Sequence, residues 1–290
     1  MLRAQKGLAR RLYLSVYNAA GSPAAPVSAP TVTVTGSDGT IHVNAQASTA
    51  LTAETGVYTY DLSPANATAT IDNLTVLWAY TIDSKAQTAT DTVMVVSSRL
   101  CSPQVIDDSL NRGGTSSNYT ARKIQIALSY AEDAFERVTA PWFATRYATA
   151  TVDGNGLETD LVLPKAPVIR VRSATVAGTA ISSTDLAALV VYEDAGIVAA
   201  ARAGVWATGR KNVTIGYEYG YADPPGDVAR AVALIATSIL SDGPWDDRGF
   251  GVSTDGGFVR LLTAGVSGAA FSIPEVQATV KNYSRVPGLQ

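Results

Sequence analysis

Apolar and polar residues alternate along the first third of the chain. In the segment RLYLSVYN, residues 11–18, the apolar Leu12, Leu14 and Val16 share one face of an extended strand. The same alternation recurs between turns rich in Gly, Pro and Asp, in residues 31–40, 56–62, 74–82 and 88–96. Short strands at this spacing are typical of two packed sheets. We therefore predict an all-β, immunoglobulin-like sandwich over residues 1–98, although the cysteine pair of antibody domains is absent.

A helical period replaces the alternation over residues 120–139. Six apolar residues at steps of three and four form one stripe: Ile124, Ala127, Leu128, Ala131, Phe135 and Val138. Three acidic residues lie mostly off this stripe: Glu132, Asp133 and Glu136. Ser117 or Asn118 is suited to cap the start of the helix, and Pro141 prevents its continuation. The pattern predicts a helix with one buried face and one solvated, acidic face.

Strand patterns return over residues 147–221, and a second helix is predicted over residues 224–240. Asp223 is suited to cap this helix, and Pro224 suits its first position. Its apolar stripe contains Val228, Val232, Ile235 and Ile239. We expect the two helices to pack together as an α+β domain with inserted strands. The predicted core of that domain consists of Ile124, Leu128, Phe135, Val228, Val232 and Ile235.

Composition changes this picture only slightly. Apolar residues make up 47% of the 290 positions and charged residues 16%, against about 25% charged in an average domain. Interface cores are depleted in charge, so this composition favours an assembly subunit. A general bias toward Ala and Thr would explain it equally well. The net charge of −3 gives no global positive field that would attract nucleic acid.

The sequence contains no pattern of catalytic or metal-binding residues. His42 and Cys101 are the only histidine and cysteine, so zinc sites and Ser-His-Asp or Cys-His catalysis are excluded. Tyr217, Tyr219 and Tyr221 alternate in one strand and suit either a stacking platform for nucleic acid or a half-buried tyrosine face. We expect no cofactor, metal, signal peptide or transmembrane helix, and we interpret His42 as an ordinary strand residue.

From residue 103 onward the chain resembles the head–tail connector, or adaptor, family of siphophages, and it looks most like the adaptors of actinobacterial phages. The similarity covers about two thirds of the chain. It is carried by the order of four segments: KIQIALSYAEDAFERVTAPWF (123–143), LVLPKAPVIRVRSATVAGTAI (161–181), VYEDAG to the Pro-started helix (191–240), and GGFVRLLTAG to FSIPEV (256–276). No one of these motifs is specific by itself, but their order and spacing are.

The resemblance implies a domain scheme. Residues 1–98 form the additional β-domain, 99–119 a linker with a short helical turn, 120–271 the head–tail adaptor domain, and 272–290 a C-terminal docking tail. The tail follows a Gly-rich stretch and is expected to bind the portal protein through Ile273, Pro274, Val276, Val280, Lys281, Tyr283 and Arg285. Alternatively, the tail packs back on its own subunit.

The resemblance also implies a function without catalysis. The chain would be made in the host bacterial cytoplasm and reside in the virion, at the capsid–tail neck, as a ring of twelve copies beneath the portal. That ring would extend the DNA channel, let genomic DNA pass without specific binding, and dock a stopper or other neck or tail protein. Two alternatives stay open: a cell-surface or carbohydrate-binding adhesion protein, and a hydrolase with a β-sandwich accessory domain.

Overall fold

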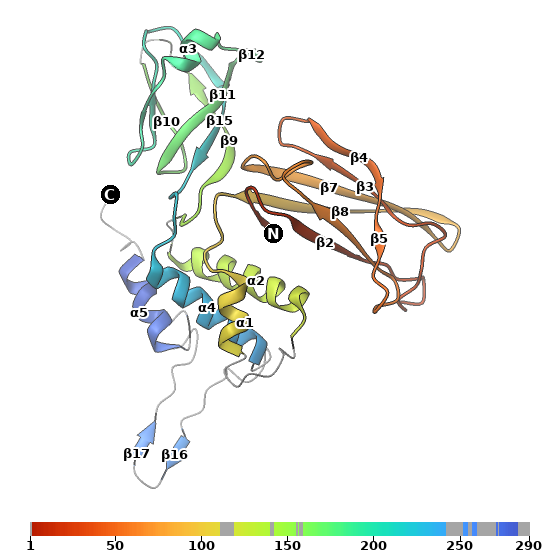
Figure 1. Cartoon of the computed structure of the whole chain (residues 1–290). Coiled ribbons are helices and arrows are strands. Elements are labelled where there is room, and N and C mark those ends of the chain that lie inside the picture. The colour runs from red at the N-terminus through yellow and green to blue at the C-terminus, as the bar shows by residue number, and fades with distance from the viewer. Residues whose placement is uncertain are drawn as a thin grey trace. The chain divides into compact units, whose positions relative to one another are not determined.

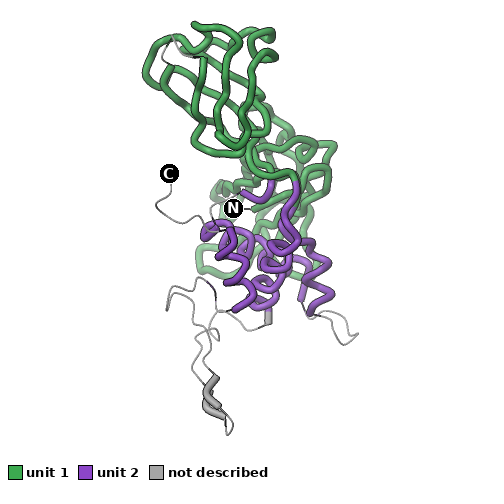
Figure 2. Tube along the Cα trace, turned by 90° about the vertical axis from the view of Figure 1, so that its left-hand side faces the viewer, with its two compact units in different colours: residues 1–98, 145–222 green, residues 99–144, 223–290 purple. Residues whose placement is uncertain are grey.

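The computed structural model describes residues 2–110, 119–139, 142–154, 156, 159–241, 252–254, 257–259, 271 and 273–283. The chain divides into two compact units, each made of two separate stretches (Figure 2). Unit 1 comprises Met1–Ser98 and Thr145–Ala222, and unit 2 comprises Arg99–Ala144 and Asp223–Gln290. Unit 1 is rich in β-strands, whereas four of the five helices belong to unit 2 among the described residues.

The first stretch of unit 1 folds into two sheets (Figure 1). One sheet has the strand order β1-β8-β7-β3-β4 and the other β2-β6-β5. The strands are β1 (Leu2–Gln5), β2 (Arg10–Ser15), β3 (Thr31–Thr35), β4 (Ile41–Ala47), β5 (Thr49–Ala50), β6 (Val57–Leu62), β7 (Asp72–Ile82) and β8 (Lys85–Val96). Apolar side chains of both sheets form one core, which includes Leu12, Val34 and the fully buried Trp78. The five predicted alternating segments overlap β2, β3, β6, β7 and β8, so the periodicity identified these strands but placed the starts of β7 and β8 two and three residues late.

Strand β1 was not predicted. It pairs in parallel with the end of β8, from Leu2 opposite Val93 to Gln5 opposite Val96. Four residues of mixed polarity give no readable period, and the pairing partner lies about ninety residues further along the chain. Arg3 is buried in this strand, although an alternation of apolar and polar residues predicts that a charged side chain faces solvent.

The second stretch of unit 1 contains two further sheets. A four-stranded sheet has the order β12-β11-β15-β9, and a three-stranded sheet has the order β10-β14-β13. The elements are β9 (Arg146–Gly154), β10 (Asp160–Val162), β11 (Val168–Val176), β12 (Thr179–Ala180), α3 (Ser183–Ala187), β13 (Val190–Tyr192), β14 (Ile197–Ala199) and β15 (Gly209–Tyr219). All the pairings in these two sheets are antiparallel. The sheets occupy the region where the sequence predicts a return to strands.

Hydroxyl groups connect the three places where the chain leaves or re-enters unit 1. The backbone N–H of Ser97 donates to the carbonyl of Thr145 (3.1 Å), and the N–H of Thr145 donates to Ser97 Oγ (3.0 Å). Ser97 Oγ also donates to the carbonyl of Ala222 (3.2 Å), and Thr145 Oγ1 to that of Tyr221 (3.0 Å). The end of β8, the start of β9 and the segment after β15 are therefore held side by side.

Unit 2 is built from helices. They are α1 (Pro103–Leu110), α2 (Ala121–Thr139), α4 (Gly226–Ser241) and α5 (Pro274–Tyr283), and two short strands, β16 (Val252–Thr254) and β17 (Gly257–Val259), pair as a hairpin. Helices α1, α2 and α5 each pack against α4, and α1 and α5 also contact α2. Helix α4 is therefore the central element of the described part of this unit.

The start of each long helix differs slightly from its prediction. Helix α4 begins at Gly226, not at Pro224, because the carbonyl of Pro225 accepts the first helical bond from Ala229 N (3.0 Å). Asp223 is therefore too early to serve as its cap. For α2, Thr120 takes the capping role, since its Oγ1 accepts from Lys123 N (3.3 Å). The predicted caps, Ser117 and Asn118, lie outside the described residues.

The structural units group the chain differently from the predicted domain scheme. The strands between α2 and α4 belong to unit 1, whereas the scheme placed them in the same domain as the helices. The predicted linker 99–119 contains helix α1, which packs on α4. The core of the first stretch nevertheless contains buried residues only from Ala4 to Val95. Independent folding of residues 1–98 stays a prediction that this self-contained core supports.

Candidate functional site

The packed face of α2 and α4 contains the residues predicted as the core. Ile124, Leu128, Phe135, Val228, Val232 and Ile235 are all at most 6% exposed. The Phe135 ring lies 5.8 Å from that of Phe143, measured between ring centroids. Two predicted stripe residues instead lie at the edge of the packing, because Val138 is 38% and Ile239 40% exposed. The apolar period therefore located the buried face and overestimated its width near the helix ends.

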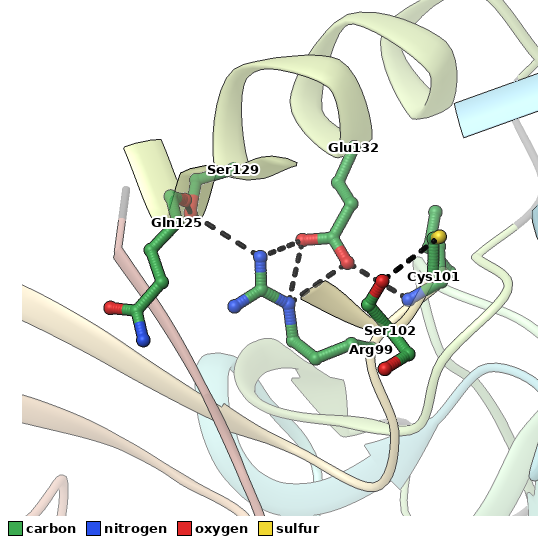
Figure 3. A network of polar contacts seen from close by, with 7 residues as sticks. Arg99, Cys101, Ser102, Gln125, Ser129 and Glu132 are labelled. Carbon is green, nitrogen blue, oxygen red and sulfur yellow. Dashed lines mark hydrogen bonds and ion pairs between the residues drawn. The ribbon is translucent and has the colours of Figure 1, made fainter. Parts of the chain in front are cut away.

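A buried arginine–glutamate pair connects the start of unit 2 to α2 (Figure 3). Arg99 Nη2 lies 2.7 Å from Glu132 Oε2, and the two side chains are 7% and 0% exposed. Arg99 Nε donates to both carboxylate oxygens at 2.9 Å. The backbone N–H of Leu100 donates to Glu132 Oε1 (2.8 Å), and Arg99 Nη2 approaches Ser129 Oγ (3.4 Å). Glu132 therefore fixes both the side chain and the backbone of the segment that enters the helical unit.

This arrangement corrects the prediction that the acidic residues of α2 form a solvated face. Glu132 and Glu136 are 0% and 3% exposed, and Asp133 is half-buried. Glu132 lies at the margin of the apolar stripe, where a helical projection cannot distinguish a buried carboxylate from a solvated one. A buried carboxylate requires a partner, and the partner here is Arg99, which the sequence placed in a linker. Nothing in the sequence around Arg99 or Glu132 predicts that these two side chains pair.

Beside this pair, Cys101 is buried and reduced. Burial raises the pKa of its thiol to about 11, and the nearby charge of Glu132 adds to the effect. The thiol is therefore protonated at neutral pH, and a protonated thiol is a poor nucleophile and metal ligand. Within the described residues, no group of three or more His, Cys, Asp or Glu side chains is placed to hold a metal ion.

Helix α5 contains most of the predicted docking residues, and its apolar face packs on its own unit. Val276 and Val280 are 0% and 3% exposed, and α5 contacts both α4 and α2. Tyr283 lies edge-on to Phe143 at 5.1 Å, and its hydroxyl donates to Asp227 Oδ1 (3.0 Å). These contacts match the alternative in which the tail packs back on its own subunit.

The remaining docking residues are distributed around this packed face. Pro274 and Lys281 are exposed, Ile273 is half-buried, and Arg285 lies outside the described residues. Glu275 forms an ion pair with Arg230 of α4, from Nε to Oε1 at 2.5 Å. Among the residues predicted to bind the portal, Pro274 and Lys281 are therefore the described ones with an accessible surface.

The two tyrosines of β15, Tyr217 and Tyr219, are buried, whereas Tyr221 lies just beyond the end of the strand. Tyr217 and Tyr219 are 0% and 2% exposed, and only Tyr221 is accessible, at 47%. Burial raises the pKa of Tyr217 to about 12, and the neighbouring Tyr219 adds to this shift. Lys165 Nζ donates to the hydroxyl of Tyr219 (3.1 Å). Buried rings cannot stack with bases, so the structure excludes a platform made of these three tyrosines.

Between the two tyrosines, Glu218 accepts from two arginines of β11. Arg170 Nη2 and Arg172 Nε donate to Glu218 Oε1 at 2.7 and 2.6 Å. Burial by itself would raise the pKa of Glu218, but these hydrogen bonds and the two positive charges outweigh it and lower the pKa. The guanidinium of Arg172 also lies over the ring of Tyr147, 5.2 Å from its centroid. Glu218 is therefore a structural carboxylate that joins neighbouring strands.

A pocket of about 420 Å³ lies on the small sheet of β2, β5 and β6. At its rim Arg11 and Asp61 form a fork of two hydrogen bonds, from Nε to Oδ1 (2.7 Å) and from Nη2 to Oδ2 (2.8 Å). Tyr60 is the one aromatic residue among its lining residues. A carbohydrate-binding protein was expected to show a cluster of exposed aromatic rings, which this pocket does not have.

The helices of the described part of the chain include none that is both long enough and apolar enough to cross a membrane. His42 is an exposed residue of strand β4, in agreement with its interpretation as an ordinary strand residue.

Comparisons with known proteins found similar chains among solved structures. No family model matches the sequence, and no curated protein is significantly similar to it. The chain is similar to a chain of the neck of an empty GTA particle computed with C6 symmetry, at 19% identity and a TM-score of 0.44, over 64% of this chain and 90% of that one. A chain of the neck of a native GTA particle computed with C12 symmetry is 18% identical, with a TM-score of 0.40. That similarity covers 64% of this chain and 92% of the other. A chain of the virion of a native gene transfer agent (GTA) particle is 20% identical, with a TM-score of 0.42. That similarity covers 64% of this chain and 90% of the other.

Proposed function

We propose that this chain is a structural head–tail adaptor of a tailed bacteriophage or phage-like particle, without catalytic activity. One observation carries the proposal. The segments that carry the resemblance to siphophage adaptors fold, in order, as α2, as β10 and β11, as β13 to β15 followed by α4, and as β17 and the start of α5. The helices among them, α2, α4 and α5, pack together in one unit. Order in the sequence and packing in space thus agree with a helical adaptor core.

The proposed assembly is a ring of twelve copies in the neck of the virion. The ring would bind the portal protein on one side and a stopper or other neck or tail protein on the other. Genomic DNA would pass through it without specific binding, which suits a chain of net charge −3. The chain would be made in the host bacterial cytoplasm before it is built into the particle.

The first stretch of unit 1 is proposed to be an immunoglobulin-like addition to this adaptor. Two sheets that share one core of residues 4–95 support this assignment. Such a domain would either decorate the outside of the neck or brace the capsid. Limited proteolysis within residues 99–119 should release a stable β-rich fragment of residues 1–98. If cleavage there leaves both products unfolded, the proposed domain boundary is wrong.

Portal binding is proposed to use the outer side of α5. Lys281 and Pro274 are accessible there, whereas Val276 and Val280 hold the helix on its own unit. Exchange of Lys281 for Glu should weaken binding to the portal and change the stability of the free chain by about 0.5 kcal/mol or less, because the side chain is exposed. The matched control is Lys85→Glu at the exposed start of β8 in unit 1, which should leave portal binding intact. Equal portal binding by wild type and Lys281→Glu would remove α5 from the contact.

Mass photometry of the full chain, alone and mixed with the portal protein of the same genome, tests the proposed function. Twelve subunits of 30.1 kDa should add about 360 kDa to the portal ring. The measurement uses no label and separates free chain from assembled rings. Failure to bind the portal and to form rings at any concentration would contradict the adaptor function.

A further inference from the structure

The outer face of the three-stranded sheet β10-β14-β13 carries mostly apolar side chains, and several of them are exposed among the described residues. Residues directly opposite each other on neighbouring strands share a face. Val162 is opposite Ile197, which is opposite Tyr192, and the next row contains Asp160, Ala199 and Val190. Val162, Tyr192 and Val190 are 66%, 54% and 52% exposed. We call these six residues the outer sheet face.

The opposite face of this sheet has the normal burial. Leu161 and Val198, which alternate with the outer residues, are 5% and 0% exposed. The strands therefore already have a core on one side, and the apolar residues of the outer sheet face are not needed for it. A contiguous exposed apolar surface on a small sheet indicates an interaction site.

Charge restricts the partner of this surface. Asp160 lies on the outer sheet face, and the exposed Glu193 and Asp194 lie in the turn that joins β13 to β14. Strands β10, β13 and β14 and this turn contain no Lys or Arg. A partner should therefore present apolar side chains among positive charges.

Helix α2 presents such a surface. Lys123, Ile126, Tyr130 and Arg137 follow one another at steps of three, four and seven residues, which places them on one line along the helix. Tyr130 is 64% and Ile126 37% exposed, and Lys123 and Arg137 are exposed at the two ends of the line. The half-buried Asp133 lies beside this line between Tyr130 and Arg137, so the surface carries two positive charges and one negative charge. We call these four residues the outer α2 stripe. It lies on the side of α2 away from the core residues Ile124, Leu128 and Phe135.

We infer that the outer sheet face of one copy binds the outer α2 stripe of the next copy. Two sheet faces brought together would oppose acidic residues to acidic residues, and two stripes would oppose Lys and Arg to Lys and Arg. Pairing the sheet face with the stripe instead places opposite charges around an apolar centre. Such a head-to-tail contact uses two different surfaces of each copy, so repetition builds a closed ring or a filament.

This inference rests on the proposed ring function and assigns the surfaces that close the ring. Cysteine cross-linking of the full chain tests it, with Tyr130→Cys on the stripe and Tyr192→Cys on the sheet face. Both positions are exposed, so the variants should retain the wild-type melting temperature. Under mild oxidation each single variant should remain uncross-linked, an equal mixture should give a covalent dimer, and the double variant should give a ladder of multimers on a non-reducing gel. The native Cys101 is buried, and wild-type chain is the control for it.

Different failures have different meanings in this experiment. If Tyr192→Cys alone forms a covalent dimer, two sheet faces meet and the inferred partner is wrong. If the double variant gives no ladder while native mass spectrometry shows wild-type rings, the ring closes elsewhere, and the proposed function stands without this inference. If wild-type chain forms no multimer with or without the portal, both are overturned. Lys123→Glu combined with Arg137→Glu should lower ring formation about tenfold or more, and unchanged ring formation would also overturn the inference.

Discussion

The two units each contain an arginine–carboxylate pair with fork geometry, and the two pairs have opposite surroundings. In unit 1, Arg11 and Asp61 are both 52% exposed on the surface of a sheet. In unit 2, Arg99 and Glu132 are 7% and 0% exposed beneath a helix, and Glu132 also accepts from the backbone of Leu100. Water screens the first pair, whereas the second has lost its hydration and depends on its partner. Two ion pairs with similar hydrogen-bond geometry are therefore expected to contribute very differently to the free energy of unfolding.

The largest effect is expected from Glu132→Ala. The substitution leaves the guanidinium of Arg99 and the N–H of Leu100 buried without their acceptor, which should cost about 3–5 kcal/mol of the free energy of unfolding. Urea denaturation of the full chain, followed by circular dichroism, measures it. A loss below about 1 kcal/mol would show that water reaches the pair, and the contrast with Arg11 and Asp61 would disappear.

An apolar truncation on the same helix sharpens the comparison. Phe135 is fully buried, and Phe135→Ala should cost about 3–5 kcal/mol through lost burial and the cavity left behind. The matched control is Tyr130→Ala, five residues earlier in the same helix and 64% exposed, which should change stability by about 0.5 kcal/mol or less. Similar losses for the two variants would mean that the buried face of α2 has been assigned wrongly.

Removal of α5 should cost somewhat less. Deleting residues 272–290 exposes the surface that Val276 and Val280 cover and removes the bond from Tyr283 to Asp227. The released chain entropy offsets part of this loss, so we expect a decrease of about 2–4 kcal/mol. A freely extended docking tail would instead leave the melting temperature of the free chain unchanged. Thermal unfolding of the truncated chain distinguishes the two arrangements.

A smaller effect should depend on pH. The pKa of Glu218 is lowered in the folded chain from its ordinary value of 4.5, so the folded state favours the ionised form. The resulting stabilisation is fully present above about pH 4.5 and is lost as the pH falls through the lower, folded pKa. Glu218→Gln lacks this carboxylate, and the stability difference between wild type and variant should shrink as the pH falls below 4.5. A difference that stays constant between pH 7 and pH 3 would contradict this assignment.

The smallest effect is expected at the exposed pair. Asp61→Ala removes the partner of Arg11 where both side chains are half exposed, so we expect a loss of about 1 kcal/mol or less. The loss should decrease further in 1 M salt, because salt screens exposed charges. A loss comparable with that of Glu132→Ala would show that fork geometry, and not burial, determines the energetic importance of these pairs.

Local periodicity was sufficient to predict the longer elements. Strands β2, β3, β6, β7 and β8 follow an alternation of period two, and α2 and α4 follow a helical stripe, because each pattern reports only which side of its own element is buried. Strand β1 and the position of Glu132 could not be obtained in this way. Each depends on a partner distant in the sequence, β8 for the first and Arg99 for the second.

The surfaces for assembly lie between these two cases. The line of Lys123, Tyr130 and Arg137 can be read from the sequence once the opposite side of α2 is known to be buried. The outer sheet face cannot, because the three short strands that form it show no usable period and only their register places Val162, Ile197 and Tyr192 in one row. Pairing between strands, not propensity within them, creates that surface.

The interruption of unit 2 by 78 residues, from Thr145 to Ala222, has a consequence for synthesis on the ribosome. Helix α2 emerges well before α4, the element against which its apolar face packs. At about 5–20 residues per second the gap lasts roughly 4–16 s. Throughout that interval the nascent chain carries an uncovered apolar helix while the intervening strands are translated. The helical unit therefore becomes complete only after these strands have been translated, and chaperones that bind exposed apolar segments have several seconds in which to act on it.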